Sequence, residues 1–182
     1  DRVSKIASIQ MLDVSTMHAA GFKAWRSFAR NVKVDDKKCR GIFRDAASRY
    51  PEYKPFEDAV LALVSLAKQS AFNVTAEATR ADWDKLIEHY SIDTLEDDNL
   101  VINLARKVLS ASISIDSEVI DFDDMIYAPL IHKSRLSKYD WVLIDEAQDT
   151  NTARRLLALG MLKTTGRLVA VGDEHQAIYG FT

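Results

Sequence analysis

Cysteine is nearly absent from this sequence, and long apolar runs are absent altogether. The 182-residue chain has one cysteine, Cys39, which excludes an internal disulfide framework. Its four histidines are scattered, with no pair at zinc-ligand spacing. No apolar run is long enough to cross a bilayer, and the first twenty residues lack the features of a signal peptide. We therefore expect a cytoplasmic protein without a membrane segment or structural zinc.

The composition is that of a globular protein with an uneven charge. Apolar residues make up 47% of the chain and charged residues 28%. Residues 21–49 hold nine Lys or Arg and three Asp, a net charge of +6 that leaves −9 for the rest of a chain of net charge −3. This asymmetry favours a polyanionic partner, although a solvated helix surface explains it equally well. The start on Asp1 suggests a piece of a longer protein.

The first two thirds of the chain are predicted to be mainly helical. Residues 10–16 form a strand candidate whose final Ser-Thr pair would cap a helix that begins near His18. Residues 35–115 have helical periodicity interrupted by breakers. Another helix is expected within 121–131, where the aspartates would complement the helix dipole and Phe122 would pack.

The last part of the chain alternates between strand and helix. A helix at about 151–163 is predicted between strands at 141–144 and 167–171. Such strands should be parallel, with a right-handed crossover. Ligands of parallel sheets bind beyond the carboxyl ends of the strands. The clusters DEAQD (145–149) and GDEHQ (172–176) follow these ends, so we expect them to share one site.

The first of these clusters has the form of a Walker B element. Asp145 and Glu146 directly follow an apolar strand, whose end would present two carboxylates. Magnesium prefers oxygen ligands and usually takes one or two protein carboxylates together with substrate phosphates. The alternative is a strand that ends in solvated acids, which is common enough to be equally good for the Asp-Glu pair alone.

Both clusters together resemble motifs of the UvrD/Rep-like helicases of superfamily one. DEAQD (145–149) is similar to their DE-x-QD motif, and VGDEHQAIYGF (171–181) is similar to VGD-x-x-Q-x-IY-x-F. VSTMHAAGF (14–22) and DFDDMI (121–126) resemble two further elements of that family. The order and spacing of the two main motifs make the resemblance specific.

The resemblance implies an α/β fold with two parts. Residues 1–30 and 116–182 would form a partial RecA-like parallel sheet of the P-loop NTPase type. Residues 31–115 would form a large all-helical subdomain inserted into it.

The resemblance also implies ATP and Mg²⁺ as cofactors. Asp145 and Glu146 would hold the metal, and Glu146 would orient and activate the attacking water. Gln176 would act beside Glu146 by contacting the γ-phosphate. The other residues implied at the nucleotide are Gln148, Asp149 and Asp173.

The implied partners are single-stranded DNA, DNA duplex junctions and the remaining helicase domains. Tyr179 and Phe181 match aromatic positions on the DNA side, where stacking grips any base. Thr16 and His18 match positions near the DNA backbone, where a helix N-terminus can receive a phosphate. The alternative is that Thr16 is only a helix cap and His18 only a surface residue.

One essential element of such a motor is missing. The sequence has no G-x-x-x-x-G-K-[ST] phosphate loop, and GMLKTTG (160–166) is rejected because Leu162 replaces the required glycine. We predict a fragment of an ATP-dependent DNA helicase or translocase, inactive alone, with the phosphate loop and second RecA-like domain elsewhere. The alternatives are the motor part of a helicase-nuclease and a non-catalytic DNA-binding or scaffolding relative.

Overall fold

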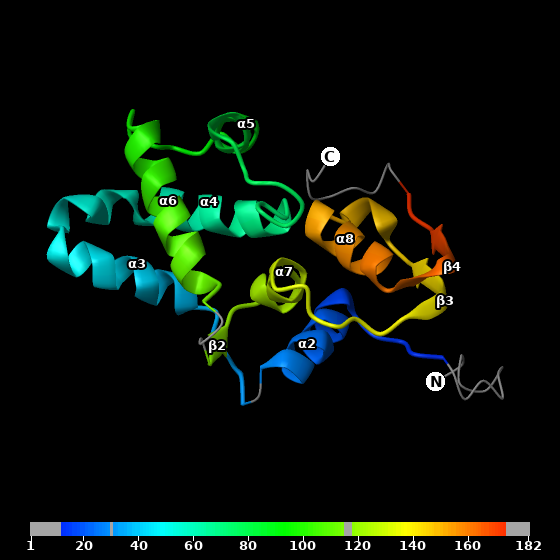
Figure 1. The fold of residues 1–182 in the computed structure, drawn as a ribbon. Helices are drawn as coiled ribbons and strands as arrows, with labels where there is room; N and C mark the ends of the chain where they lie inside the picture. Colours follow the sequence, from blue (N-terminus) through cyan, green and yellow to red (C-terminus); the bar gives the residue numbers. More distant parts are fainter. Residues whose placement is uncertain (1–11, 30, 115–117, 174–182) are drawn as a thin grey trace.

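The computed structural model describes residues 12–29, 31–114 and 118–173 (Figure 1). The elements in chain order are α2 (Met17–Phe28), β1 (Lys33–Val34), α3 (Lys38–Arg49), the 3₁₀ helix η1 (Pro51–Phe56), α4 (Glu57–Gln69), α5 (Arg80–Tyr90), α6 (Asp98–Ser112), β2 (Val119–Ile120), α7 (Asp124–Ile131), β3 (Tyr139–Ile144), the 3₁₀ helix η2 (Ala147–Asp149), α8 (Thr152–Gly160) and β4 (Leu162–Ala170). Most of the described residues lie in helices, and the described strands form two parallel pairs, β1 with β2 and β3 with β4.

Helices α3 to α6 form a block with its own apolar core. Figure 1 shows these helices at one side of the molecule, β3, β4 and α8 at the other, and α2 and α7 between them. Phe43, Leu63, Trp83 and Val101 are almost fully buried where the helices of the block meet. Their removal from water stabilises each contact by about 1.5–3 kcal/mol per side chain. The helical periodicity of this region is therefore confirmed.

The block begins and ends at neighbouring points. β1 lies before α3 and β2 follows α6, and the two pair in parallel with Lys33 opposite Val119 and Val34 opposite Ile120. The chain therefore leaves for the helical block and returns from it side by side.

The strand, helix and strand at the end of the chain are also confirmed. β3 and β4 are parallel, with Val142 opposite Leu168 and Ile144 opposite Ala170. Val142 and Ile144 pack against Ala158 of α8. Alternation along β3 leaves Trp141 (52% exposed) on the face away from this cluster.

The predicted end of the helix in this unit was wrong. α8 ends at Gly160, and β4 already begins at Leu162, where the prediction continued the helix to 163. β3 begins at Tyr139, two residues earlier than predicted, and Tyr139 pairs with Leu162. Thr164 and Thr165 also favour a strand because they are β-branched. Pairing with a distant strand thus outweighs the local helical pattern.

Two further expectations need correction. The described part of the strand candidate, residues 12–16, is not in a strand, and Leu12 and Val14 are exposed rather than paired. Phe122 does not pack in the core but is 56% exposed, at the edge of a cavity of about 270 Å³. Its neighbours Asp121 and Asp124 turn inward instead. No helix in the described ranges is both long and apolar enough to cross a membrane.

Candidate nucleotide site at the ends of two parallel strands

The carboxyl end of β3 carries a strained backbone. Ile144 is buried, whereas Asp145 and Glu146 are exposed immediately after it. Glu146 has φ 52° and ψ 47°, a left-handed conformation that is uncommon for residues other than glycine. Its amide donates to Asp145 Oδ1 at 3.0 Å. Seven other non-glycine residues of the described ranges also have a positive φ, so this conformation fixes the direction of the Glu146 side chain but does not by itself mark a site.

Hydrogen bonds hold the ends of β3 and β4 together, as expected for a shared site. The amide of Ala147 donates to the carbonyl of Val171 at 2.9 Å. The amide of Asp173 donates to Gln148 Oε1 at 3.0 Å. Gln148 Nε2 in turn donates to Glu146 Oε2 at 2.6 Å. Gln148 therefore connects the carboxylate of the first cluster to the backbone of the second.

Gly172 makes this approach possible. A Cβ atom there would lie 2.3 Å from Gln148 Oε1 and 2.9 Å from the amide nitrogen of Ala147. Neither distance is compatible with a side chain, so the glycine of the second cluster is required by the backbone of the first.

The charge of this strand end is not compensated by the described part of the protein. Neither Asp145 nor Glu146 forms an ion pair with a described Lys or Arg. The described residues also contain no group of three or more His, Cys, Asp or Glu arranged as a metal site. Two exposed carboxylates fit Mg²⁺, which completes its shell with water and phosphate oxygens. Asp149 Oδ1 is buried without a hydrogen-bond partner in the described residues.

Two of the candidate DNA-binding residues, Thr16 and His18, lie at the start of α2. Thr16 caps this helix, because its side chain accepts a hydrogen bond from the amide of Ala19 at 3.1 Å. The predicted helix start near His18 is thus confirmed. His18 is half-buried rather than on the open surface, and burial, followed by the charge of Arg154, lowers its pKa. The remaining site predictions, Gln176, Tyr179 and Phe181, lie outside the described residues.

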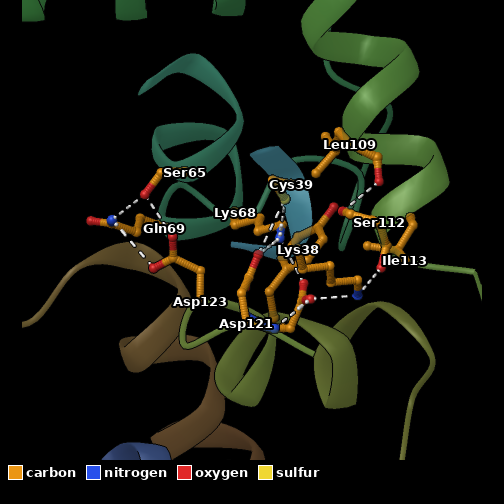
Figure 2. A network of polar contacts seen from close by, with 12 residues as sticks. Lys38, Cys39, Ser65, Lys68, Gln69, Leu109, Ser112, Ile113, Asp121 and Asp123 are labelled. Carbon is orange, nitrogen blue, oxygen red and sulfur yellow. Dashed lines mark hydrogen bonds and ion pairs between the residues drawn. The ribbon is translucent and has the colours of Figure 1, made fainter. Parts of the chain in front are cut away.

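A buried cluster of lysines and aspartates was missed from the sequence. Lys68 Nζ lies 2.6 Å from Asp121 Oδ2 (Figure 2). Lys68 Nζ also lies 2.8 Å from Asp124 Oδ1, and Lys38 Nζ lies 2.8 Å from Asp124 Oδ2. Lys38 also donates to the carbonyl of Ser112. Asp124 Oδ1 accepts no well-oriented hydrogen bond, so Lys68 compensates its charge only. These aspartates therefore join α7 to the helical block, which goes beyond the dipole role expected for them.

The cluster shifts the pKa values of its members. Burial alone would lower the pKa of Lys68, but the charges of Asp124 and Asp121 outweigh it and raise that pKa. Burial would raise the pKa of Asp121, but the charge of Lys68 holds it below its usual value. Burial raises the pKa of Cys39 to about 12, so its thiol keeps its proton and donates to Asp121 at 3.2 Å. Lys68 falls on the apolar face of α4 with Val60 and Val64, which was the available signal.

The comparisons with known proteins agree on one family. A sequence model of the UvrD/REP helicase N-terminal domain matches residues 1–182. F-box DNA helicase protein 1 of Schizosaccharomyces pombe is 31% identical over 129 residues, which cover 64% of this chain and 14% of that protein. ATP-dependent DNA helicase Rep of Buchnera aphidicola subsp. Baizongia pistaciae is 24% identical over 194 residues, 99% of this chain and 27% of that protein. Rep of Escherichia coli is 35% identical over 71 residues, 35% of this chain and 10% of that protein. The chain thus spans a minor part of each relative.

Proposed function

The chain belongs to the UvrD/REP helicase N-terminal domain family, and on that basis we propose that it is part of an ATP-dependent DNA helicase or translocase. The observation that carries the proposal is the junction of the two strand ends, where Gln148 links Glu146 to Asp173. Relatives named as ATP-dependent DNA helicases support the same activity.

We propose a partial RecA-like sheet for residues 1–30 and 116–182, with the helical block of residues 31–115 inserted into it. The parallel strand, helix and strand unit supports the first part. The parallel pairing of β1 with β2 supports the second, because an inserted block must leave and return at neighbouring points. The exposed apolar side chains Trp141 and Leu143 are consistent with further sheet or domain contacts on that face.

The proposed chemistry is metal-assisted hydrolysis of ATP. Asp145 and Glu146 would hold Mg²⁺, which supplies charge neutralisation at the phosphates when bound. Glu146 orients and deprotonates the attacking water, and its fixed backbone and the hydrogen bond from Gln148 hold the carboxylate in place. Asp149 and Asp173 complete the network around the nucleotide. Gln176 is assigned to the γ-phosphate.

We assign the DNA side to the segment that follows β4 in the sequence and to the start of α2. Tyr179 and Phe181 would stack on bases of single-stranded DNA, and Thr16 and His18 would lie near its backbone. Gln176 and Tyr179 are close in sequence. Loss of the γ-phosphate contact at Gln176 would therefore directly change the contact of Tyr179 with the DNA bases. Duplex junctions and the other helicase domains are the remaining proposed partners.

The central test is ATP hydrolysis by the longest natural form of the protein, with and without single-stranded DNA. Glu146→Gln should lower turnover about 100-fold or more, because it removes the general base. Asp140→Asn is the matched control, since Asp140 lies on the same strand in an exposed pair with Lys163. Hydrolysis that persists in Glu146→Gln would overturn the assignment of the base. A folded protein without any hydrolysis would favour the non-catalytic alternative.

A second variant tests the DNA side separately. Tyr179→Ala should keep hydrolysis in the absence of DNA and weaken its stimulation by DNA, because only base stacking is removed. Equal losses with and without DNA would contradict this division between Glu146 and Tyr179.

A further inference from the structure

A polar contact connects the helical block to the helix that follows DEAQD. Asn151, 8% exposed, is the N-cap of α8, and its Oδ1 accepts from the amide of Arg154 at 3.0 Å. Its Nδ2 donates to Oε1 of Gln69, the last residue of α4, at 3.5 Å. The cap of α8 therefore depends on both its own helix and the block.

The other end of the Gln69 amide is held tightly. Gln69 Nε2 donates to Ser65 Oγ at 3.0 Å and approaches Asp123 Oδ1 at 3.4 Å (Figure 2). Ser65 Oγ donates to Asp123 Oδ2 at 2.6 Å. Lys68, next to Gln69, is fixed by the lysine and aspartate cluster. The contact between Gln69 and Asn151 is the longest of these hydrogen bonds and therefore the weakest of them.

From Asn151 the contacts continue to the acidic strand end. Arg154, whose amide is bound by Asn151, donates through Nη1 to the carbonyl of Asp149 at 2.8 Å. The amide of Asp149 donates to the carbonyl of Glu146 at 3.0 Å. Three hydrogen bonds therefore lead from Asn151 through Arg154 and Asp149 to the backbone carbonyl of Glu146.

The junction is too small to be a ligand site. The cavity beside Gln69 and Asn151 measures about 10 Å³ and is also lined by His18, Asp123 and Arg154. This is close to the volume that one water molecule occupies. Its residues come from α2, the turn before α7, α4 and the start of α8, so their role is to set the relative positions of these elements.

We propose that Gln69 is a positioning residue that acts through Asn151 and Arg154 to place Glu146. The helical block carries part of the basic segment of residues 21–49, where a nucleic acid would bind. Movement of the block changes the placement of Glu146, which couples nucleic acid at that segment to hydrolysis. This inference rests on the proposed function.

Two conservative variants of the longest natural form test the coupling. Gln69→Met keeps the length of the side chain and removes its amide, while Asn151→Asp keeps the cap acceptor and removes the donor. Each should lower the stimulation of hydrolysis by single-stranded DNA roughly 2- to 10-fold. The double variant should fall no further than Gln69→Met alone, since that variant already lacks the contact with Asn151. If the double variant loses stimulation by the product of the two single losses, the two residues act independently and the proposal is overturned. Asn103→Met, on the exposed face of α6, is the control and should leave stimulation unchanged.

Amide hydrogen exchange gives a readout that does not need activity. Peptides that cover residues 145–155 should exchange roughly 2- to 10-fold faster in Gln69→Met and Asn151→Asp, the range expected for one lost hydrogen bond. The Asn103→Met control should exchange at the wild-type rate. Unchanged exchange in the two test variants would overturn the inference alone, whereas absent hydrolysis in the wild type would overturn the proposed function.

Discussion

The two aspartate-rich segments of the chain have opposite surroundings. Residues 121–124 place Asp121 and Asp124 in the interior, where Lys68 and Lys38 compensate them at 2.6–2.8 Å. Residues 145–149 place Asp145 and Glu146 on the surface, without a described ion pair. We call Asp121 and Asp124, with their neighbour Asp123, the inner group, and Asp145 and Glu146 the outer group. The inner group has its counter-charges within the protein, whereas the outer group has no described ion pair.

This difference separates a structural use of acids from a ligand-binding use. A buried carboxylate is costly unless a cation and hydrogen bonds accompany it, so the inner group must be paired to exist. An exposed carboxylate bears no such cost and stays available to a metal. Charge compensation thus distinguishes the two groups more clearly than their sequences do.

The largest expected effect comes from breaking the inner group. Lys68→Met should lower the free energy of unfolding by about 3–5 kcal/mol, because Asp121 and Asp124 would stay buried without their shared cation. Urea denaturation of the longest natural form, followed by circular dichroism, measures the loss. Lys107→Met on the exposed face of α6 is the control and should cost less than about 0.5 kcal/mol. Equal losses in both variants would show that the pairing does not support the fold.

A smaller effect is expected at the outer group from Gly172→Ala. The new Cβ would meet the backbone nitrogens of Ala147 and Gln148 within about 3 Å, so the two strand ends must separate. We expect a cost of about 1–3 kcal/mol in the same assay. Gly41→Ala is the control, because no atom lies within 4 Å of its Cβ position and helix α3 should gain about 0.5–1 kcal/mol. A harmless Gly172→Ala would contradict the close approach.

The stability contributed by Asp121 and by Asp123 should depend on pH in opposite directions. The pKa of Asp121 is lowered by Lys68 despite burial, so its contribution to stability is present above its unfolded pKa of about 3.9 and is lost as the pH falls through the lower folded value. Burial raises the pKa of Asp123, so its contribution is present below about pH 3.9 and is lost as the pH rises through the higher folded value. Unfolding free energies between pH 3 and 7 for Asp121→Asn and Asp123→Asn should change with opposite slopes relative to the wild type. Slopes of the same sign would contradict the assignment.

The smallest expected effect is on the stability of the outer carboxylates. Asp145→Asn and Glu146→Gln should each change the free energy of unfolding by less than about 0.5 kcal/mol, because these exposed side chains have no described ion pair to lose. Urea denaturation without nucleotide or magnesium measures this directly. A large loss would mean that the outer carboxylates also support the fold, which would contradict their distinction from the inner group.

Local signals predicted much of the fold. Thr16 caps α2 and the parallel unit of β3, α8 and β4 is present, because capping and strand periodicity depend on residues near in sequence. The joining of the two clusters followed from strand polarity alone and is seen in the contact of Gln148 with Asp173. The roles of Gln176, Tyr179 and Phe181 stay predictions.

Long-range contacts account for what the sequence did not reveal. Lys38 and Asp124 are 86 positions apart, so no local pattern contains both. The inward turn of Asp121 and Asp124 also explains why Phe122 points outward. Likewise, the early start of β4 depends on the partner Tyr139, which lies outside the helical window.

Gly21 has a consequence for how the molecule opens. A Cβ atom at this position would lie 2.2 Å from the carbonyl oxygen of Met125, so the backbones of α2 and α7 touch without a side chain between them. Because close-packed helices have no free space to slide past each other, we expect α2 and α7 to open together in local unfolding. The start of α2, with Thr16 and His18, and the start of α7, with Asp124, should then become exposed to solvent in one step.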